Sequence, residues 1–221
     1  MERKASDSLC IIVKTLGPVQ TNAYILGDNA SGDAVVIDPG WNGDVIMQEI
    51  DQRGWQLQAV WLTHAHFDHL GGVAAMEKLS QQPLPVALHS EDLPLWRAAG
   101  GANLFGFSSF DAGPEPTIKL QHGDKLRIGT QNLTVRHTPG HTPGHVIFVH
   151  SDAKVVFCGD LIFQSGVGRT DLPGGSWSHL LQSIRTQVLV LSDDTLLYPG
   201  HGPATTVGEE RRSNPFLTGE F

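Results

Sequence analysis

The sequence predicts a single α/β domain in which two halves each contain a strand, a helix and a second strand. With 221 residues, the chain can bury one large core, whereas two full domains would be cramped. An apolar segment at 35–38 ends in Asp, one at 60–64 ends in His, and a predicted helix lies between them. The same order recurs at 155–160 and 196–201 around another predicted helix, which indicates a weak βαβ duplication.

In chain order, the first half begins with three predicted strands separated by glycine-containing turns. A helix is expected from Asn42 or Gly43 to Gly54, because Val45, Ile46, Glu49 and Ile50 make a partial apolar stripe. Residues 55–62 then form the strand that leads into a histidine-rich run. The three opening strands are Leu9–Val13, Asn22–Leu26 and Ala34–Ile37.

Asp38, which follows the third strand within Asp38-Pro39-Gly40, has two interpretations. Aspartate, proline and glycine are common turn residues, so the run can be a turn with no further role. Alternatively, the carboxylate orients a metal ligand from a neighbouring loop. Both interpretations stay open from the sequence.

The middle of the chain alternates short elements with a long connection. Residues 73–79 have the composition of a helix, 83–88 of a strand, and Ser90 can cap a short helix that has acidic residues in its first turn. His89 beside it is interpreted as structural. Residues 99–117 are rich in Gly, Ser, Pro and Phe, which predicts an irregular lid or binding wall.

The second half begins with a predicted hairpin of Lys125–Ile128 and Leu133–Arg136, followed by a proline- and glycine-rich loop at 137–145. Further strands are predicted at 146–150 and 155–160, ending in Asp160. A helix is expected over Ser176–Leu191, where five apolar side chains make a broad face. The last strand ends in Pro199-Gly200-His201.

Composition excludes several classes of protein. The formal charge is −8, from 15 basic and 23 acidic residues, which argues against a nucleic-acid partner. The apolar run at 9–13 is too short for a signal or membrane segment, so no membrane association and a cytoplasmic location are expected. Cys10 and Cys158 lie in apolar runs and are predicted to be buried, reduced thiols. Nothing in the sequence indicates the oligomeric state.

The densest group of metal-binding residue types is the run His64-Ala65-His66-Phe67-Asp68-His69. If the strand direction persists, His64 and His66 point the same way and can hold one ion. Asp68 and His69 follow as a helix begins, displaced from the first pair. This spacing predicts two adjacent metal positions rather than solvated loop histidines.

The loop at 137–145 offers three more histidines, of which one or two can face a common point. His141, held between two Pro-Gly pairs, is favoured as a ligand over His137 and His145, which are interpreted as hydrogen-bonded structural residues. Asp160 and His201 each end an apolar strand and complete the set of candidates.

Together, these motifs and their order resemble the ligand motifs of the metallo-β-lactamase fold superfamily. Gly166-Val167-Gly168-Arg169-Thr170-Asp171 and Asn214-Pro215-Phe216-Leu217 further resemble its small, glyoxalase II-like bacterial hydrolases. The resemblance implies a four-layer αββα sandwich with two divalent metals bridged by Asp160. It assigns His64, His66 and His141 to the first metal, and Asp68, His69 and His201 to the second.

The activity that this resemblance implies is hydrolysis of a thioester, with a 2-hydroxyacyl glutathione such as S-lactoylglutathione as substrate and a metal-bridging hydroxide as nucleophile. Asp68 and Asp160 are the expected catalytic residues, and Arg169 the expected substrate-binding residue. Zinc is the expected metal, with iron or manganese compatible with the same ligands. No Ser-His-Asp triad is evident or needed.

Two alternatives to a thioester hydrolase remain open. A mono-iron persulfide dioxygenase of the same superfamily shares the Gly-Arg-Thr-Asp stretch, but His69 and His201 complete a second site and so favour hydrolysis. A metal-binding protein without turnover is the alternative from another functional class.

Overall fold

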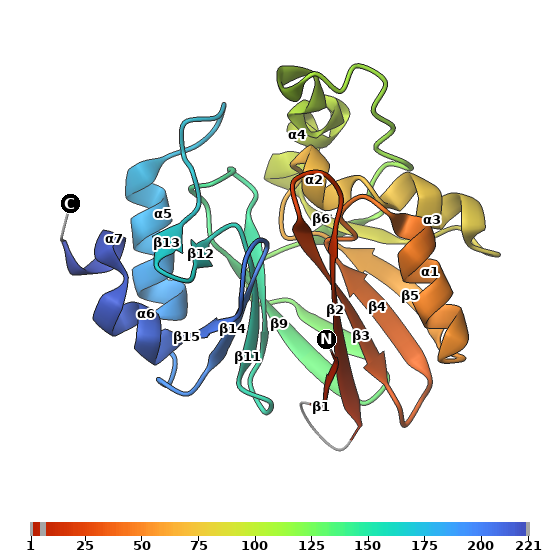
Figure 1. The fold of residues 1–221 in the computed structure, drawn as a ribbon, viewed down its shortest axis with the longest axis horizontal. Coiled ribbons are helices and arrows are strands. Elements are labelled where there is room, and N and C mark those ends of the chain that lie inside the picture. Colours follow the sequence, from red (N-terminus) through yellow and green to blue (C-terminus); the bar gives the residue numbers. More distant parts are fainter. Residues whose placement is uncertain (1, 5–7, 220–221) are drawn as a thin grey trace.

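The computed structural model describes residues 2–4 and 8–219, which form two β-sheets that face each other (Figure 1). The first sheet has seven strands in chain order, antiparallel from β1 to β4 and parallel from β4 to β7. These strands are β1 (Glu2–Lys4), β2 (Leu9–Leu16), β3 (Thr21–Asp28), β4 (Asp33–Ile37), β5 (Gln56–Trp61), β6 (Val86–His89) and β7 (Ile118–Leu120).

The second sheet comes from the other half of the chain and has the order β15-β14-β11-β10-β9-β8. A separate two-stranded hairpin, β12 and β13, follows β11. The strands of this half are β8 (Lys125–Ile128), β9 (Gln131–His137), β10 (Val146–His150), β11 (Val155–Gly159), β12 (Ile162–Phe163), β13 (Gly166–Val167), β14 (Leu196–Pro199) and β15 (Thr205–Thr206).

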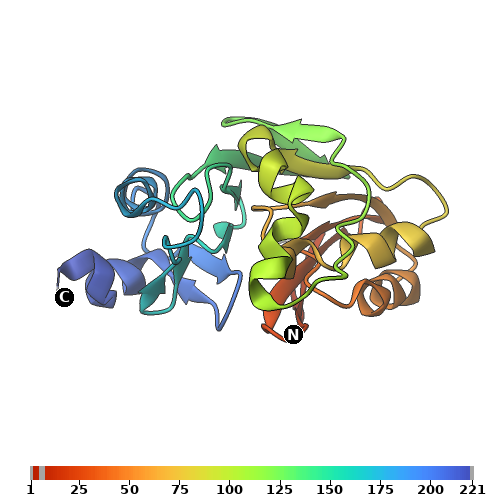
Figure 2. The same ribbon diagram turned by 90° about the horizontal axis from the view of Figure 1, so that it is seen from above.

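Helices cover the outer face of each sheet, as Figure 1 and the view from above in Figure 2 show. On the side of the first sheet these are α1 (Gly43–Gln52), α2 (Phe67–Leu70), α3 (Val73–Leu79), η1 (Ser90–Asp92), α4 (Leu93–Arg97) and η2 (Ala99–Phe105). On the side of the second sheet they are α5 (Trp177–Ser183), the π-helical η3 (Ile184–Val188), α6 (Val207–Ser213) and α7 (Pro215–Thr218).

Three apolar layers hold these elements together. Alternation along β2 divides its side chains, because Cys10 and Ile12 join the cluster under α1 and α3, whereas Leu9 and Ile11 join the cluster between the sheets. A third cluster packs the second sheet against α5 and η3. This order of helices, sheet, sheet and helices confirms the αββα sandwich.

The two βαβ units are present as predicted. Strands β4 and β5 are parallel and flank α1, and β11 and β14 are parallel and flank α5 and η3. The helix expected over Ser176–Leu191 is not one regular helix, since α5 ends at Ser183 and a π-helical turn continues to Val188. The connection at 99–117 is less irregular than expected, because η2 occupies its first seven residues.

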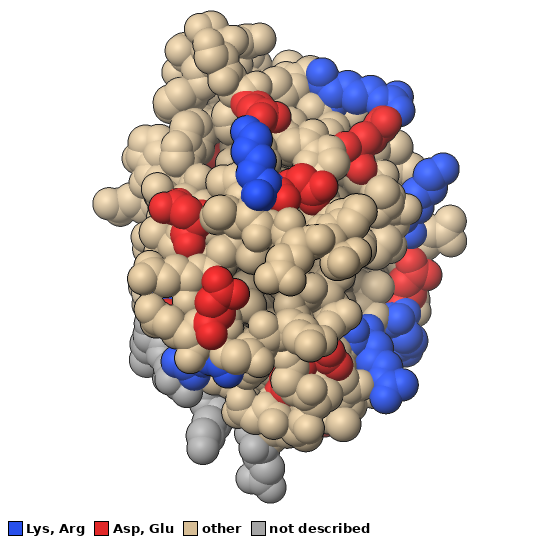
Figure 3. Space-filling view, turned by 90° about the vertical axis from the view of Figure 1, so that its right-hand side faces the viewer, with Lys and Arg blue, Asp and Glu red and all other residues tan. Residues whose placement is uncertain are grey.

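The surface agrees with the composition. On the face formed by α1 and α3, Lys and Arg are interspersed with Asp and Glu, and no continuous basic stripe is visible (Figure 3). Within the described chain, every helix is too short or too polar to span a bilayer. Cys10 and Cys158 are both buried and form no disulfide within the described residues, as predicted.

Candidate metal centre

The fold brings His64, His66 and His141 together from two loops. His64 follows β5, and His66 is the residue before α2, where its extended backbone starts the helix. His141 comes from the loop between β9 and β10. Its Nε2 lies 2.8 Å from His66 Nδ1 and 3.2 Å from His64 Nε2, so three ring nitrogens converge on one point. All three side chains are buried.

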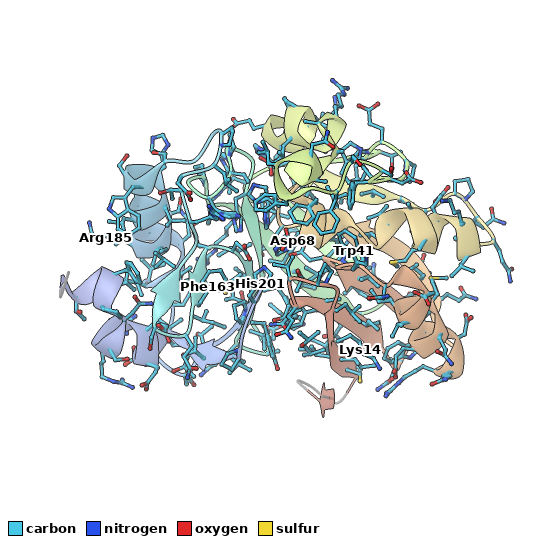
Figure 4. All side chains as sticks on the ribbon, turned by 45° about the horizontal axis from the view of Figure 1, so that its top comes forward. Lys14, Trp41, Asp68, Phe163, Arg185 and His201 are labelled. Atoms are coloured by element: carbon cyan, nitrogen blue, oxygen red, sulfur yellow. The ribbon has the colours of Figure 1, made fainter. Side chains whose placement is uncertain are left out.

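A second group lies beside the first and combines Asp68, His69 and His201. Asp68 Oδ2 is 3.2 Å from His201 Nε2 and 3.6 Å from His69 Nε2. Asp160, at the end of β11, faces both groups: its Oδ2 is 3.5 Å from His141 Nε2, and its Oδ1 is 3.3 Å from His69 Nε2. The carboxylate is therefore placed where it can bridge two cations. Figure 4 shows Asp68 and His201 between the two halves of the molecule.

An independent observation indicates that these histidine and aspartate side chains suit divalent cations. Among the described residues, the buried polar side-chain atoms without a hydrogen-bond partner are His69 Nε2 and Asp160 Oδ1, which face each other. Buried polar groups are normally satisfied, and a cation between this nitrogen and this oxygen would satisfy both. Imidazole nitrogens and carboxylate oxygens are ligands for zinc, iron and manganese alike.

The electrostatics of the carboxylates point the same way. Burial alone disfavours charge on His69 and lowers its pKa, but Asp160, Asp68 and Asp38 outweigh burial and raise the pKa well above its usual value. Burial likewise opposes charge on Asp160, yet His69 and its other neighbours lower its pKa. The clustered carboxylates thus favour a positive charge at this place.

Burial keeps the first three histidines neutral. Desolvation is the main cause that lowers the pKa of His64 well below its usual value and that of His66 to about 3. The pKa of His141 is lowered for the same reason. Neutral imidazole is the form that binds metals, so these side chains are ready to act as ligands without losing protons.

Asp38 has both of the roles that the sequence left open: it lies in a turn, and its carboxylate orients a candidate metal ligand. Its Oδ1 accepts from the backbone N–H of Thr63 at 2.8 Å, and its Oδ2 accepts from Thr63 Oγ1 at 2.6 Å. The same Oδ2 lies 2.9 Å from His69 Nδ1. With Nδ1 bonded in this way, Nε2 of His69 is directed toward Asp160.

The other histidines of the 137–145 loop are hydrogen-bonded inside the protein. His145 Nε2 accepts from the backbone N–H of Asp160, and its Nδ1 meets Thr138 Oγ1 at 2.9 Å. His137 Nε2 donates to the carbonyl of Pro143 at 2.8 Å. His141 differs from both, because its Nδ1 bonds the carbonyl of Arg169 at 2.8 Å and leaves Nε2 facing His64 and His66.

A pocket of about 500 Å³ opens over the candidate metal centre. Its walls are largely apolar, as is usual for small-molecule sites. The ring of Phe105 in η2 is tilted by 35° against that of Phe67, with 5.0 Å between the ring centroids, so part of the 99–117 connection forms a wall of this pocket. The apolar lining residues are Val19, Phe67, Phe105, Phe163, Val167 and Leu172.

Arg169 lies at this pocket, although its guanidinium is paired. Its Nε and Nη2 bond the two carboxylate oxygens of Asp171 at 2.8 and 2.7 Å. Both side chains are more than half exposed, so the pair is at the rim. This pairing could not be predicted from the sequence, because an exposed aspartate two residues away from an arginine has no distinguishing pattern.

A separate group of potential ligands, His89, Glu91 and His137, lies elsewhere. The rings of His89 and His137 stack with centroids 4.1 Å apart and planes only 15° apart. A cation about 2 Å from one nitrogen of each ring would lie outside both ring planes, which coordination disfavours. We therefore interpret this stack as structural, as expected for His89.

Sequence reasoning missed three polar residues around the centre. Thr21 Oγ1 donates to Asp68 Oδ2 at 3.1 Å, and Thr63 links Asp38 to the histidine loop. Asp92 is a fully buried carboxylate bonded to both ligand loops. A threonine in a strand or an acid in the first turn of a helix is too common in sequences to be distinguished.

Comparison with known proteins gives the family. A family model described as the metallo-beta-lactamase superfamily matches residues 16–201. The hydroxyacylglutathione hydrolase GloC of Haemophilus influenzae is 38% identical over 200 residues, which cover 90% of this chain and 93% of that protein.

Two solved structures are also similar over nearly their whole length. BLEG-1, a B3 metallo-beta-lactamase, has a TM-score of 0.88 at 38% identity, covering 94% of this chain and 99% of that one. TTHA1623, in a di-iron-bound form, has a TM-score of 0.84 at 41% identity, covering 93% and 100%. The matched residues, the identities and the shared αββα architecture agree, and the chain belongs to the metallo-β-lactamase superfamily.

Proposed function

We propose that the protein hydrolyses a thioester, with a 2-hydroxyacyl glutathione such as S-lactoylglutathione as its substrate. The observation that carries the proposal is the convergence of seven potential metal ligands beside a pocket whose walls are largely apolar. The name of GloC, a similar protein, supports the substrate class. Zinc as the metal and a cytoplasmic location belong to the same proposal, and the di-iron form of TTHA1623 supports iron as the alternative metal.

In this proposal His64, His66 and His141 would hold one cation, Asp68, His69 and His201 would hold the other, and Asp160 faces both groups. When bound, two such ions supply Lewis acidity that activates a water molecule and stabilises negative charge on the carbonyl oxygen. The residues supply the placement. Asp38 and the carbonyl of Arg169 orient His69 and His141 by their Nδ1 atoms.

Asp68 has a further proposed role, which is to orient the proton of the attacking water. Its Oδ2 accepts from Thr21 and faces His201, so the carboxylate has a fixed orientation at the pocket wall. The reaction adds water across the acyl carbon–sulfur bond and yields a carboxylic acid and a thiol. Because a thiol has a pKa near 8.5, it leaves as the thiolate without a strong proton donor.

The pocket walls support an acyl thioester as ligand. Apolar side chains surround the candidate metal centre, and Arg169 is the cationic residue among the described pocket-lining residues. We propose that Arg169 binds a carboxylate of the glutathione moiety at the rim. The salt bridge to Asp171 is exposed, so it is weak enough for a carboxylate of the substrate to compete.

The test is a thioester panel on protein of known metal content. S-lactoylglutathione hydrolysis, followed by thiol release, is expected in the wild type and is expected to be nearly abolished in Asp160→Ala and His141→Ala. A fully metallated protein that releases no thiol from any thioester would contradict the proposal. Hydrolysis of a chromogenic cephalosporin, motivated by the similarity to BLEG-1, and oxygen uptake with glutathione persulfide are the competing outcomes.

A further inference from the structure

Asp92, the last residue of η1, is a buried carboxylate that the proposed chemistry does not use. Its side chain is fully buried and accepts three hydrogen bonds. Oδ2 accepts from the backbone N–H of Ala65 at 2.9 Å and from Thr142 Oγ1 at 2.8 Å, and Oδ1 accepts from the backbone N–H of Gly144 at 2.6 Å. All three donors belong to the two loops that carry candidate ligands.

The three donors lie next to candidate ligands of the first metal position. Ala65 lies between His64 and His66, and Thr142 directly follows His141. The three hydrogen bonds therefore join the parts of the molecule that supply the first metal position. The described hydrogen bonds of Asp92 do not reach Asp68, His69 or His201, which supply the second position.

Close packing shows that the contact is built into the fold. A Cβ atom on Gly144 would lie 2.6 Å from the backbone nitrogen of Asp92 and 2.7 Å from its Oδ1. Real Cβ atoms do not approach so closely, so the bond to Asp92 requires glycine at 144. A buried carboxylate is expensive unless it is fully hydrogen-bonded, and Asp92 meets that condition only when both loops are in place.

We infer that Asp92 is a positioning residue that holds the His64–His66 loop against the His141 loop and thereby sets the affinity of the first metal position alone. The inference rests on the ligand assignment of the proposed function. Residues that orient metal ligands in this way typically change metal affinity by 10–100-fold when replaced.

Single-site variants test the selectivity. His201→Ala removes a ligand of the second position and leaves the first, whereas His66→Ala does the reverse. Metal-free protein of each background is titrated with Co²⁺, followed by visible absorption. Adding Asp92→Asn is expected to weaken Co²⁺ binding about 10–100-fold in the His201→Ala background and less than about two-fold in the His66→Ala background.

Glu210 provides a matched control for loss of a buried charge. It is also fully buried and accepts three hydrogen bonds, from the backbone N–H of Ser165, from Thr205 Oγ1 and from Asn214 Nδ2. Glu210→Gln is expected to lower the melting temperature by an amount similar to Asp92→Asn and to leave Co²⁺ affinity unchanged in both backgrounds.

Thr142→Val keeps the test valid if Asp92→Asn does not fold, because it removes one hydrogen bond to Asp92 and preserves the side-chain shape. It is expected to weaken the first position about two- to ten-fold, and Thr142→Ser is expected to restore the affinity. Equal losses in both backgrounds, or no loss in either, would overturn the inference. Failure of both single-site backgrounds to bind Co²⁺ would instead contradict the ligand assignment itself.

Discussion

Asp38 shows how one residue joins backbone geometry to the candidate metal centre. Its φ is +48°, in the left-handed region that non-glycine residues rarely adopt and that aspartate and asparagine tolerate best. This turn directs the carboxylate at Thr63 and His69. The turn residues were recognisable from the sequence, but the partner of the carboxylate was not, because His69 lies 31 positions away.

Asp38→Asn separates these two roles. Asparagine keeps the tolerance for positive φ, but its amide nitrogen replaces an oxygen that faces Thr63 Oγ1 and His69 Nδ1. We expect metal at the His69 position to bind about 10–100-fold more weakly, measured as metal retained after dialysis. Asp33→Asn, at the opposite end of β4, is the control. Wild-type metal content in Asp38→Asn would show that the carboxylate does not orient His69.

The Arg169–Asp171 pair gives a second prediction at this scale. Arg169→Ala is expected to raise KM for S-lactoylglutathione with little change in kcat, because a cation at the rim binds ground and transition states alike. Asp171→Asn frees the guanidinium and is expected to lower KM about two- to five-fold, the range of an exposed ion pair. The control is Arg185→Ala, on the outer surface of η3 in Figure 4. A fall in kcat at constant KM for Arg169→Ala would rule out this role.

Among the elements, those with a strong apolar period were predictable. The alternating strands around 9–37 and the buried strands before His64, Asp160 and His201 occur where expected. Strands β7, β12, β13 and β15 have two or three residues each, too few for any period to be recognised. The change from α5 to the π-helical η3 also leaves no periodic signal, because the apolar face remains continuous across it.

The end of β3 gives a prediction about pH and stability. Asp28 accepts from the backbone N–H of Thr130 at 2.6 Å and from Thr130 Oγ1 at 2.7 Å, so it connects the first sheet to the turn between β8 and β9. Burial alone raises the pKa of Asp28, but the bonds from Thr130 and Ala30 outweigh burial and lower it. The carboxylate therefore stabilises the fold above its unfolded pKa, near 3.9, and this contribution is lost as the pH falls below that value.

Asp28→Asn is thus expected to lower the free energy of unfolding by about 2 kcal/mol at pH 7. The deficit relative to wild type should be the same at about pH 5 and smaller at about pH 3.5, because the carboxyl becomes protonated in the unfolded wild-type chain near pH 3.9 while its lowered pKa keeps it ionised in the folded one. Urea denaturation at the three pH values measures the deficit, with Asp51→Asn on the surface of α1 as the control. A deficit that does not shrink in acid would show that the negative charge is not what stabilises this contact.

At the scale of the whole molecule, the candidate metal centre lies where the halves meet. His64, His66, Asp68 and His69 come from the first half, whereas His141, Asp160 and His201 come from the second. The residue types and their order along the chain made this set predictable from the sequence. Asp92, which ties the two ligand loops together, was not, because its burial results from the packing of both halves.

Metal removal should therefore destabilise the entire fold. A ligand that binds only the folded state stabilises it by about 2.7 kcal/mol at 100 times its dissociation constant. For a domain of this size, we expect chelation to lower the melting temperature by about 5–10 °C in differential scanning fluorimetry. Asp160→Ala, which loses the residue between both positions, should respond much less to the chelator. Superimposable melting curves for loaded and chelated wild type would contradict metal binding across the halves.

Because the candidate ligands come from both halves of the chain, they are synthesised at different times. A ribosome reaches His201 only after adding 137 residues beyond His64, which takes roughly 7–27 s at ordinary rates of synthesis. In the first part of that interval, until His141 is added, the only candidate ligands that have been synthesised are His64, His66, Asp68 and His69. The candidate ligand set is complete only after His201 has been synthesised, so a cation that bound earlier would lack part of its ligands.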